Sequence, residues 1–414
     1  MRKGNIKYIL SISLLLIGGL ACKKGGGGDD NSTSNTPAAI AVLPKLETTT
    51  AADITTTSAT IKAAVTDKGS SSVTEQGVVW SSTANPTLAN NKAGVSTISG
   101  SGAFTSEIKG LTASTKYYVR AFAVNKAGVA YGNEIEFTTA DIAGATFGFS
   151  PLYIVGSTVA AADIEVLTDG GDAVTERGIV YASTPSPTIK SSKVKHNNAG
   201  LGKFRVSLKD LTPKTTYYAR AYAINSKGAS YSSEVTFKTI AKGNVTYTIN
   251  KSSNPTNEEM DVYARIKEAA DSACWYLNNY TSATKNITLN YVPDVATADA
   301  TNTGWVRYGK NTTYQKLRTT LHEFNHTLGT GTTDWWTGTA IVNGVYTGSS
   351  VNTLLKKITG KDAPLNGDRM HWWPYGLNQD SEVTSSWDYV YNCLIIEAMR
   401  KDGLPEWSSG TYTP

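Results

Sequence analysis

Hydrophobic residues follow two different periods along the chain. Between residues 45 and 240 the apolar positions recur every second residue, as in 117–124. This alternation is typical of strands that bury one face. Beyond residue 242 the apolar positions recur every third or fourth residue, which predicts amphipathic helices. We expect helices over 257–280, 313–328 and 387–401, with strands over 287–292 and 304–308, the second at a sheet edge.

Both of the first two helices have a start signal in the sequence. Thr256 and Glu259 have the spacing of a capping box before the first helix, and Thr312 and Gln315 have it before the second. In a capping box each of the two side chains bonds the backbone N–H of the other residue. The chain beyond residue 242 is therefore expected to mix helices and strands.

The all-β region contains an internal repeat. The string VTEQG at 73–77 returns as VTERG at 174–178, and TKYYVRA at 115–121 returns as TTYYARA at 215–221. An offset of about 100 residues is a whole domain rather than one turn of a solenoid. About seven short strands in such a unit predict a β-sandwich.

The repeated string LTxxTxYYxRA, at 111–121 and 211–221, resembles fibronectin type III-like modules. The resemblance implies two immunoglobulin/fibronectin-like sandwiches, over 45–140 and 141–240, in which the Leu and the first Tyr of the string fix one corner. Such modules bind glycans or proteins, or act as spacers. We favour the spacer, because a fold does not carry a function by itself.

The first residues have the pattern of an export signal. Three basic residues precede an apolar run at 8–20, which is too short to span a bilayer comfortably and is followed by Cys22. The pattern resembles bacterial lipoprotein signals, with Leu20 one place later than their usual Leu. The resemblance implies a signal peptide at 1–21 and lipidation of Cys22, which would anchor the protein in the outer membrane or at the cell surface.

Composition narrows the class of partner. The Gly/Ser/Thr-rich segment 22–44 cannot bury a core and is expected to be a flexible tether. The formal net charge is +5, and removal of Arg2, Lys3 and Lys7 with the signal leaves about +2 (5 − 3). We find no basic stripe, so nucleic acid is not an expected partner. Cys274 and Cys393 remain, as a disulfide or as two buried thiols.

The motif HEFNH at 322–326 carries the clearest chemistry. Two His four residues apart share one face of a helix, so His322 and His326 could hold one metal ion. Glu323 lies beside them and could take a proton from metal-bound water. Zinc fits best, because two imidazoles and an open position suit a Lewis acid that acidifies water. The helix is expected to bury a single apolar stripe, formed by Leu317, Leu321, Phe324 and Leu328.

A two-His site needs a third ligand. Up to Gly329 the motif resembles the metzincin peptidases, but Thr332 stands where their third His would be. We favour His371 on ligand chemistry, because it is the other His beyond residue 242. Glu382 would give the two-His-plus-Glu set of thermolysin-like enzymes, and Asp334 lies just past the turn.

The strings HEFNHTLGTGTTDWW and DRMHWWPYGLNQDSE together resemble an exported zincin-like domain. The resemblance implies an α+β metallopeptidase domain over 243–414, with Zn²⁺ as cofactor and a protein or glycoprotein as substrate. We expect the protein to be a monomer. Glu323 would be the general base, and Tyr375 could steady the oxyanion. Several aromatic residues lie near the motif in sequence and either line a cleft or pack the loops. They are Trp335, Trp336, Trp372 and Trp373.

Two other functions compete with peptide hydrolysis. A surface adhesin or glycan-binding lipoprotein with an inactive zincin domain is suggested by Thr332 in the third-His position. A zinc hydrolase that cuts a non-peptide bond, such as a cell-wall or sugar amide, also fits the HExxH motif.

Overall fold

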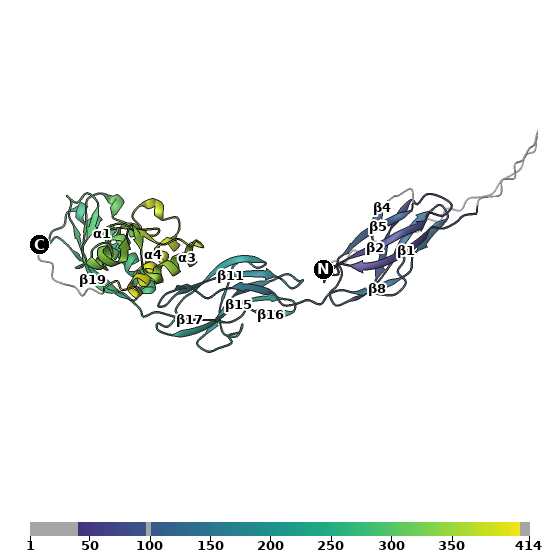
Figure 1. Ribbon diagram of the computed structural model, residues 1–414, viewed down its shortest axis with the longest axis horizontal. Coiled ribbons are helices and arrows are strands. Elements are labelled where there is room, and N and C mark those ends of the chain that lie inside the picture. Colours follow the sequence, from purple (N-terminus) through teal and green to yellow (C-terminus); the bar gives the residue numbers. More distant parts are fainter. Residues whose placement is uncertain (1–39, 97–100, 406–414) are drawn as a thin grey trace, which may run out of the picture.

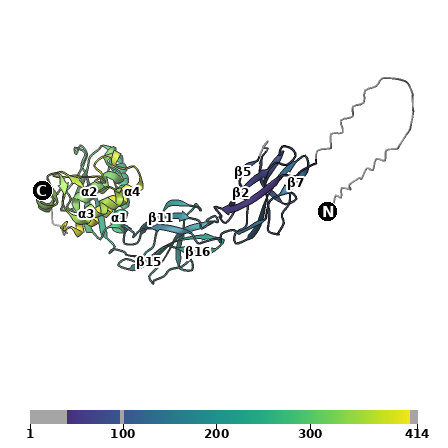
Figure 2. The same ribbon diagram turned by 45° about the vertical axis from the view of Figure 1, so that its right-hand side comes forward.

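The computed structural model describes residues 40–96 and 101–405. The expected signal peptide, Cys22 and most of the tether lie outside these residues. The described residues form three units in a row, two β-sandwiches and then a unit with helices (Figures 1 and 2). In the part of the chain that the structure describes, we find no helix that is long and apolar enough to cross a membrane.

The first sandwich packs a sheet of order β1-β2-β5 against one of order β4-β3-β6-β7, in which β8 also pairs with β6. All its pairings are antiparallel, and Ile61, Val78 and Val119 are buried between the sheets. The strands are β1 (Lys45–Ala52), β2 (Ser58–Asp67), β3 (Glu75–Ser81), β4 (Asn91–Ser96), β5 (Gly102–Lys109), β6 (Lys116–Asn125), β7 (Gly128–Tyr131) and β8 (Ile135–Thr138).

The second sandwich repeats this plan. A sheet of order β10-β11-β14, with β9 also paired to β11, faces a sheet of order β13-β12-β15-β16, with β17 paired to β15. The strands are β9 (Thr146–Phe149), β10 (Ile154–Val155), β11 (Ala160–Thr168), β12 (Glu176–Ala182), β13 (Ser192–Lys195), β14 (Gly202–Leu208), β15 (Thr216–Asn225), β16 (Gly228–Tyr231) and β17 (Val235–Lys238).

A tyrosine fixes the same corner of both sandwiches. The Tyr117 hydroxyl accepts a hydrogen bond from the Thr112 N–H at 3.0 Å, and Tyr217 accepts one from Thr212 at the same distance. Strand order and tyrosine corner are those of immunoglobulin/fibronectin-like sandwiches. The fold predicted for the two repeats is confirmed.

The third unit is built on a four-stranded sheet of order β18-β19-β21-β20. The first three strands are parallel and β20 is antiparallel to β21. Helix α1 (Asn257–Tyr280) connects β18 to β19 and begins with the expected capping box of Thr256 and Glu259. The strands are β18 (Asn244–Asn250), β19 (Thr284–Tyr291), β20 (Ala298–Ala300) and β21 (Trp305–Tyr308).

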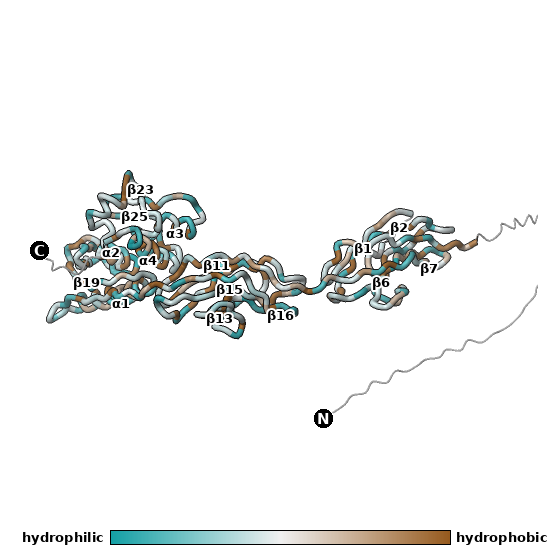
Figure 3. Tube along the Cα trace, turned by 60° about the horizontal axis from the view of Figure 1, so that its bottom comes forward, coloured by the Kyte–Doolittle hydropathy of each residue, from teal (hydrophilic) through white to brown (hydrophobic). Residues whose placement is uncertain are grey.

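Three further α-helices, three short 3-10 or π-helical segments and a small antiparallel sheet complete the described part of this unit. The sheet has the order β22-β23-β24-β25, and its last two strands form a hairpin. The elements are α2 (Leu317–Thr327), β22 (Ile341–Val342), β23 (Val345–Tyr346), α3 (Ser349–Thr359), β24 (Asn366–Gly367), β25 (Trp372–Trp373) and α4 (Ser386–Lys401). In Figure 3, β11 of the second sandwich runs toward α4 and α1.

Several sequence expectations for this unit need correction. The strand at 305–308 is interior, because the three-residue strand β20, too short to give a pattern, covers its outer edge. Helix α3 was missed. Thr312 and Gln315 do not cap α2, since the Gln315 side chain instead donates to the Gly309 carbonyl and accepts from Arg265. Cys274 and Cys393 are buried free thiols rather than a disulfide.

Candidate metal centre

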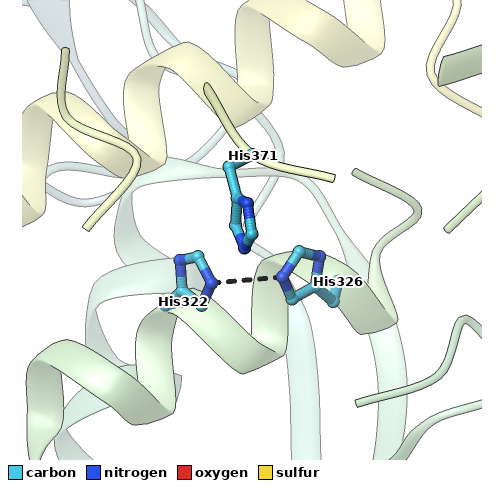
Figure 4. Close-up of side chains that lie close together, drawn as sticks. All are labelled: His322, His326 and His371. Atoms are coloured by element: carbon cyan, nitrogen blue, oxygen red, sulfur yellow. Dashed lines mark hydrogen bonds between the residues drawn. The ribbon is translucent and has the colours of Figure 1, made fainter. Parts of the chain in front are cut away.

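Helix α2 presents two imidazoles one turn apart, and the β24–β25 hairpin adds a third. The Nε2 atoms of His322 and His326 lie 3.1 Å apart. The His371 ring lies 5.5 Å from that of His322 and 5.9 Å from that of His326, between centroids. One ligand atom from each residue lies within 4.8 Å of the others. Figure 4 shows a His371 nitrogen pointing between the two helix histidines.

The apolar stripe of α2 holds these histidines in place. Leu321 and Phe324 are fully buried, Leu328 is buried and Leu317 packs against the same core, as the sequence predicted. Because the stripe faces the core, His322 is half-buried on the neighbouring face and His326 is buried.

The hairpin turn that carries His371 is ordered by Asp368. One Asp368 carboxylate oxygen accepts hydrogen bonds from the backbone N–H groups of Met370, at 2.7 Å, and His371, at 2.6 Å. The Asp368 N–H in turn donates to the His371 carbonyl at 2.9 Å. These bonds set the direction of the His371 side chain, with its Nδ1 3.6 Å from Asp368 Oδ1.

Backbone carbonyls fix the tautomers of the helix histidines. His322 Nδ1 lies 2.8 Å from the Gly376 oxygen, and His326 Nδ1 lies 2.7 Å from the Thr330 oxygen. A carbonyl only accepts, so each Nδ1 must carry the proton. Burial lowers the pKa of His322 to about 3 and also lowers the pKa of His326. Both rings are therefore neutral near pH 7, with bare lone pairs on Nε2.

Two lone pairs that face each other at 3.1 Å do not form a hydrogen bond, and the dashed line in Figure 4 marks this approach. A shared cation would remove the repulsion. Nitrogens bound at 2.0–2.1 Å to a tetrahedral ion stand about 3.3 Å from each other. The donor set therefore fits a metal that takes neutral imidazoles, and zinc is the commonest of these.

Glu323 lies between the two helix histidines in sequence and is 5% exposed. Burial, and to a smaller extent the charge of Asp299 on β20, raise the pKa of Glu323 to about 8, while Arg318 opposes the shift. A carboxyl that changes its protonation near neutral pH is suited to general acid–base work.

The alternative third ligands do not join the histidines. Both Glu382 carboxylate oxygens are occupied, by the N–H groups of Leu377 at 3.0 Å and Asn378 at 3.1 Å. Asp334 is exposed. The Thr332 hydroxyl donates to the His326 carbonyl at 2.7 Å. Glu382 thus shapes the loop that supplies the Gly376 oxygen, and Thr332 caps the end of α2.

Arg318 is a contributor that sequence reasoning missed. It lies one turn before His322 on α2, and its buried guanidinium donates to the Leu377 carbonyl at 2.7 Å and pairs with Asp380, also at 2.7 Å. It therefore ties the 376–380 loop to the helix. The available signal was an arginine four residues before the first His of the motif.

The aromatic residues divide between the two roles considered. Trp336 and Trp372 are buried and pack the core of the unit. Trp373 is 43% exposed and lies between two hollows, of about 500 and 600 Å³, the smaller of which His371 also lines. The Tyr375 ring packs against Tyr391, with centroids 5.2 Å apart.

Among known proteins, this chain is similar to several solved structures. No family model matches it, and no curated protein matches it. Solved structures similar to part of it include the sensor domain of the anti-sigma factor RsgI4 of Pseudobacteroides cellulosolvens, with 19% identity, a TM-score of 0.21, and 24% of this chain and 78% of that chain covered.

Two multidomain structures are also similar to part of it. The FN1–FN3 domains of chicken CNTN1 share 15% identity with a TM-score of 0.21, covering 48% of this chain and 69% of that one. A set of titin domains shares 18% identity with a TM-score of 0.22, covering 48% and 67%. The sandwich fold itself rests on the strand order and corner tyrosines described above.

Proposed function

We propose that this protein is a zinc-dependent hydrolase of the zincin type that cuts peptide bonds. One observation carries the proposal: three imidazoles converge on one point, and two of them are held by carbonyls in the tautomer that leaves Nε2 free. His322, His326 and His371 would hold the ion, with a fourth position left for reactants, as in catalytic zinc sites.

Zn²⁺, when bound, would polarise a carbonyl and acidify a water molecule. Glu323 would take the proton of the attacking water and then deliver it to the leaving amine. The hollow lined by His371 and Trp373 would receive the substrate. The exposed indole of Trp373 offers a flat apolar face beside the reacting groups.

The experiment compares purified full-length protein with Glu323→Gln and His371→Ala. We expect one zinc per chain in the wild type and in Glu323→Gln, and peptide hydrolysis lowered by about 10²–10⁴-fold in Glu323→Gln. His371→Ala should lose most of its zinc. A wild type without stoichiometric zinc would instead support the surface-binding alternative.

Zinc binding without peptidase activity, together with cleavage of an amide in cell-wall or sugar substrates, would support the non-peptide hydrolase. The proposal keeps export and a lipid anchor at Cys22. Metabolic labelling with a fatty acid tests the anchor, because Cys22→Ser should abolish the label and release the protein from membranes.

A further inference from the structure

The second sandwich and the third unit share a hydrophobic core. Ile154 of β10 and Ala161 of β11 belong to the same buried cluster as the core residues of α1 and α4. The backbones also meet closely. The Ser157 N–H donates to the Asn279 carbonyl at 2.6 Å, and a β-carbon on Gly156 would lie 2.1 Å from the same oxygen. This sandwich is therefore packed directly against the unit that carries the three histidines.

Arg205 of β14 is the charged contact across this junction. Its guanidinium pairs with Asp163 on the neighbouring strand, through Nε at 2.6 Å and Nη2 at 2.8 Å. Its Nη1 donates to the Tyr391 hydroxyl at 2.8 Å. The same group lies over the Trp387 ring, 4.6 Å from the centroid. Trp387 and Tyr391 are one turn apart on α4, so Arg205 contacts one face of that helix.

Helix α4 in turn contacts the loop that orients His322. The Tyr391 ring packs edge-on against Tyr375, and Asn392 donates to the Tyr375 carbonyl at 2.8 Å. Tyr375 has a φ of 70°, a conformation that a residue with a large side chain adopts only under external restraint. The next residue, Gly376, supplies the carbonyl that fixes the His322 tautomer.

The first sandwich provides an internal comparison. Asp163 and Arg205 face each other across β11 and β14, and the corresponding register in the first sandwich pairs Lys62 with Thr105. The fold is the same, but the acid–base pair is absent at that place. The Asp163–Arg205 pair is therefore not required by a sandwich of this type and belongs to the junction with α4.

We propose that Arg205 is a positioning residue for the metal centre, and that the second sandwich belongs to the same functional unit as the metal site. Arg205 acts through Tyr391 and Tyr375 on the Gly376 carbonyl, and so on the orientation of His322. The inference rests on the proposed function in assuming that the three histidines bind zinc.

The test uses the full-length protein and the metal alone as probe. Arg205→Met keeps an apolar stem over Trp387 but removes the bonds to Asp163, Tyr391 and the Tyr153 hydroxyl. Groups that hydrogen-bond to metal ligands change metal affinity by 10–100-fold when removed. Because Arg205 acts on the Gly376 carbonyl only through Tyr391 and Tyr375, we expect an effect at the low end of this range. Zinc affinity, measured by competition with a chelator, should fall about tenfold. The visible spectrum of the Co²⁺-loaded protein should shift as well.

The chain offers a matched control in Arg220 of the same sandwich. Arg220 also lies 4.6 Å from a ring centroid, that of Tyr231, and its Nε donates to a backbone carbonyl at 3.0 Å. Arg220→Met should leave the zinc affinity and the Co²⁺ spectrum unchanged. This control separates loss of the α4 contact from general loosening of the sandwich.

A milder variant covers the case in which Arg205→Met does not fold. Tyr391→Phe removes only the hydroxyl that Arg205 contacts, and should lower zinc affinity in the same direction by a smaller factor. Wild-type zinc affinity and Co²⁺ spectra in both variants would overturn the positioning role alone. A wild-type chain that binds no zinc would overturn the proposed function and this inference together.

Discussion

Gly331 lies so close to Met370 that a β-carbon on Gly331 would stand 2.1 Å from the Met370 carbonyl oxygen. Gly331 also has a φ of 70°, which disfavours any side chain. The turn after α2 therefore lies directly against the hairpin that carries His371. We therefore expect the spacing of the three imidazoles to depend on this approach.

The first prediction follows from that approach. Gly331→Ala should push the hairpin away and weaken zinc binding by at least tenfold, because a ligand displaced by even an ångström leaves the coordination range. Gly338→Ala is the control, since a β-carbon there meets nothing within 4 Å. Isothermal titration with zinc measures both variants. Equal affinities would show that the turn and hairpin are not coupled.

A second prediction compares the zinc binding of variants at the three residues that the sequence suggested as the third ligand. Glu382→Gln keeps one oxygen but loses the charge that binds two backbone N–H groups of the loop, so zinc affinity should fall several-fold. Asp334→Asn should have no effect, because Asp334 is exposed. His371→Ala should have the largest effect of the three. Zinc content after dialysis ranks them, and a larger loss in Asp334→Asn than in His371→Ala would refute the ligand set.

The third prediction concerns pH and the metal-free protein. Burial raises the pKa of Glu323 from 4.5 to about 8. Below pH 4.5 the folded and unfolded chains both hold the proton, so Glu323 does not affect stability. Between pH 4.5 and 8 only the unfolded chain releases it, so the folded state loses stability as pH rises, and above pH 8 the loss is complete.

Glu323→Gln lacks this titration and should be more stable than wild type at pH 8, on the order of a few kcal/mol, and similar to it near pH 4.5. Urea unfolding in the presence of a chelator measures the difference. Parallel stability curves for the two proteins would contradict the buried, neutral carboxyl.

A fourth prediction concerns the thiols. Cys274 and Cys393 are buried and unpaired, and burial raises the pKa of Cys274 to about 12. Neither should react with a thiol reagent in the native protein at pH 8, because the thiolate is the reactive form. Both should react after denaturation without a reductant. A mass two units lower and no labelling would instead indicate a disulfide.

The sequence predicted the elements whose pattern is long and regular. The 100-residue repeat, the α1 helix and the apolar stripe of α2 could all be read from periodicity alone. His371 was favoured by its chemistry, but its position could not be derived, because it lies in a turn between two-residue strands that carry no period. The role of Arg205 could not be predicted either, for a different reason. The repeat shows Thr105 in its place, yet nothing in the sequence indicates that α4 packs there.

His326 and His371 come from segments 45 residues apart (371 − 326) that meet only in the folded unit. A cation held by both would close the intervening chain as a covalent crosslink does. From the entropy of closing a loop of this length, such a crosslink would raise the free energy of unfolding by on the order of 4 kcal/mol. Metal supply in the compartment where the protein matures would then govern how long it survives there, apart from any turnover of substrate.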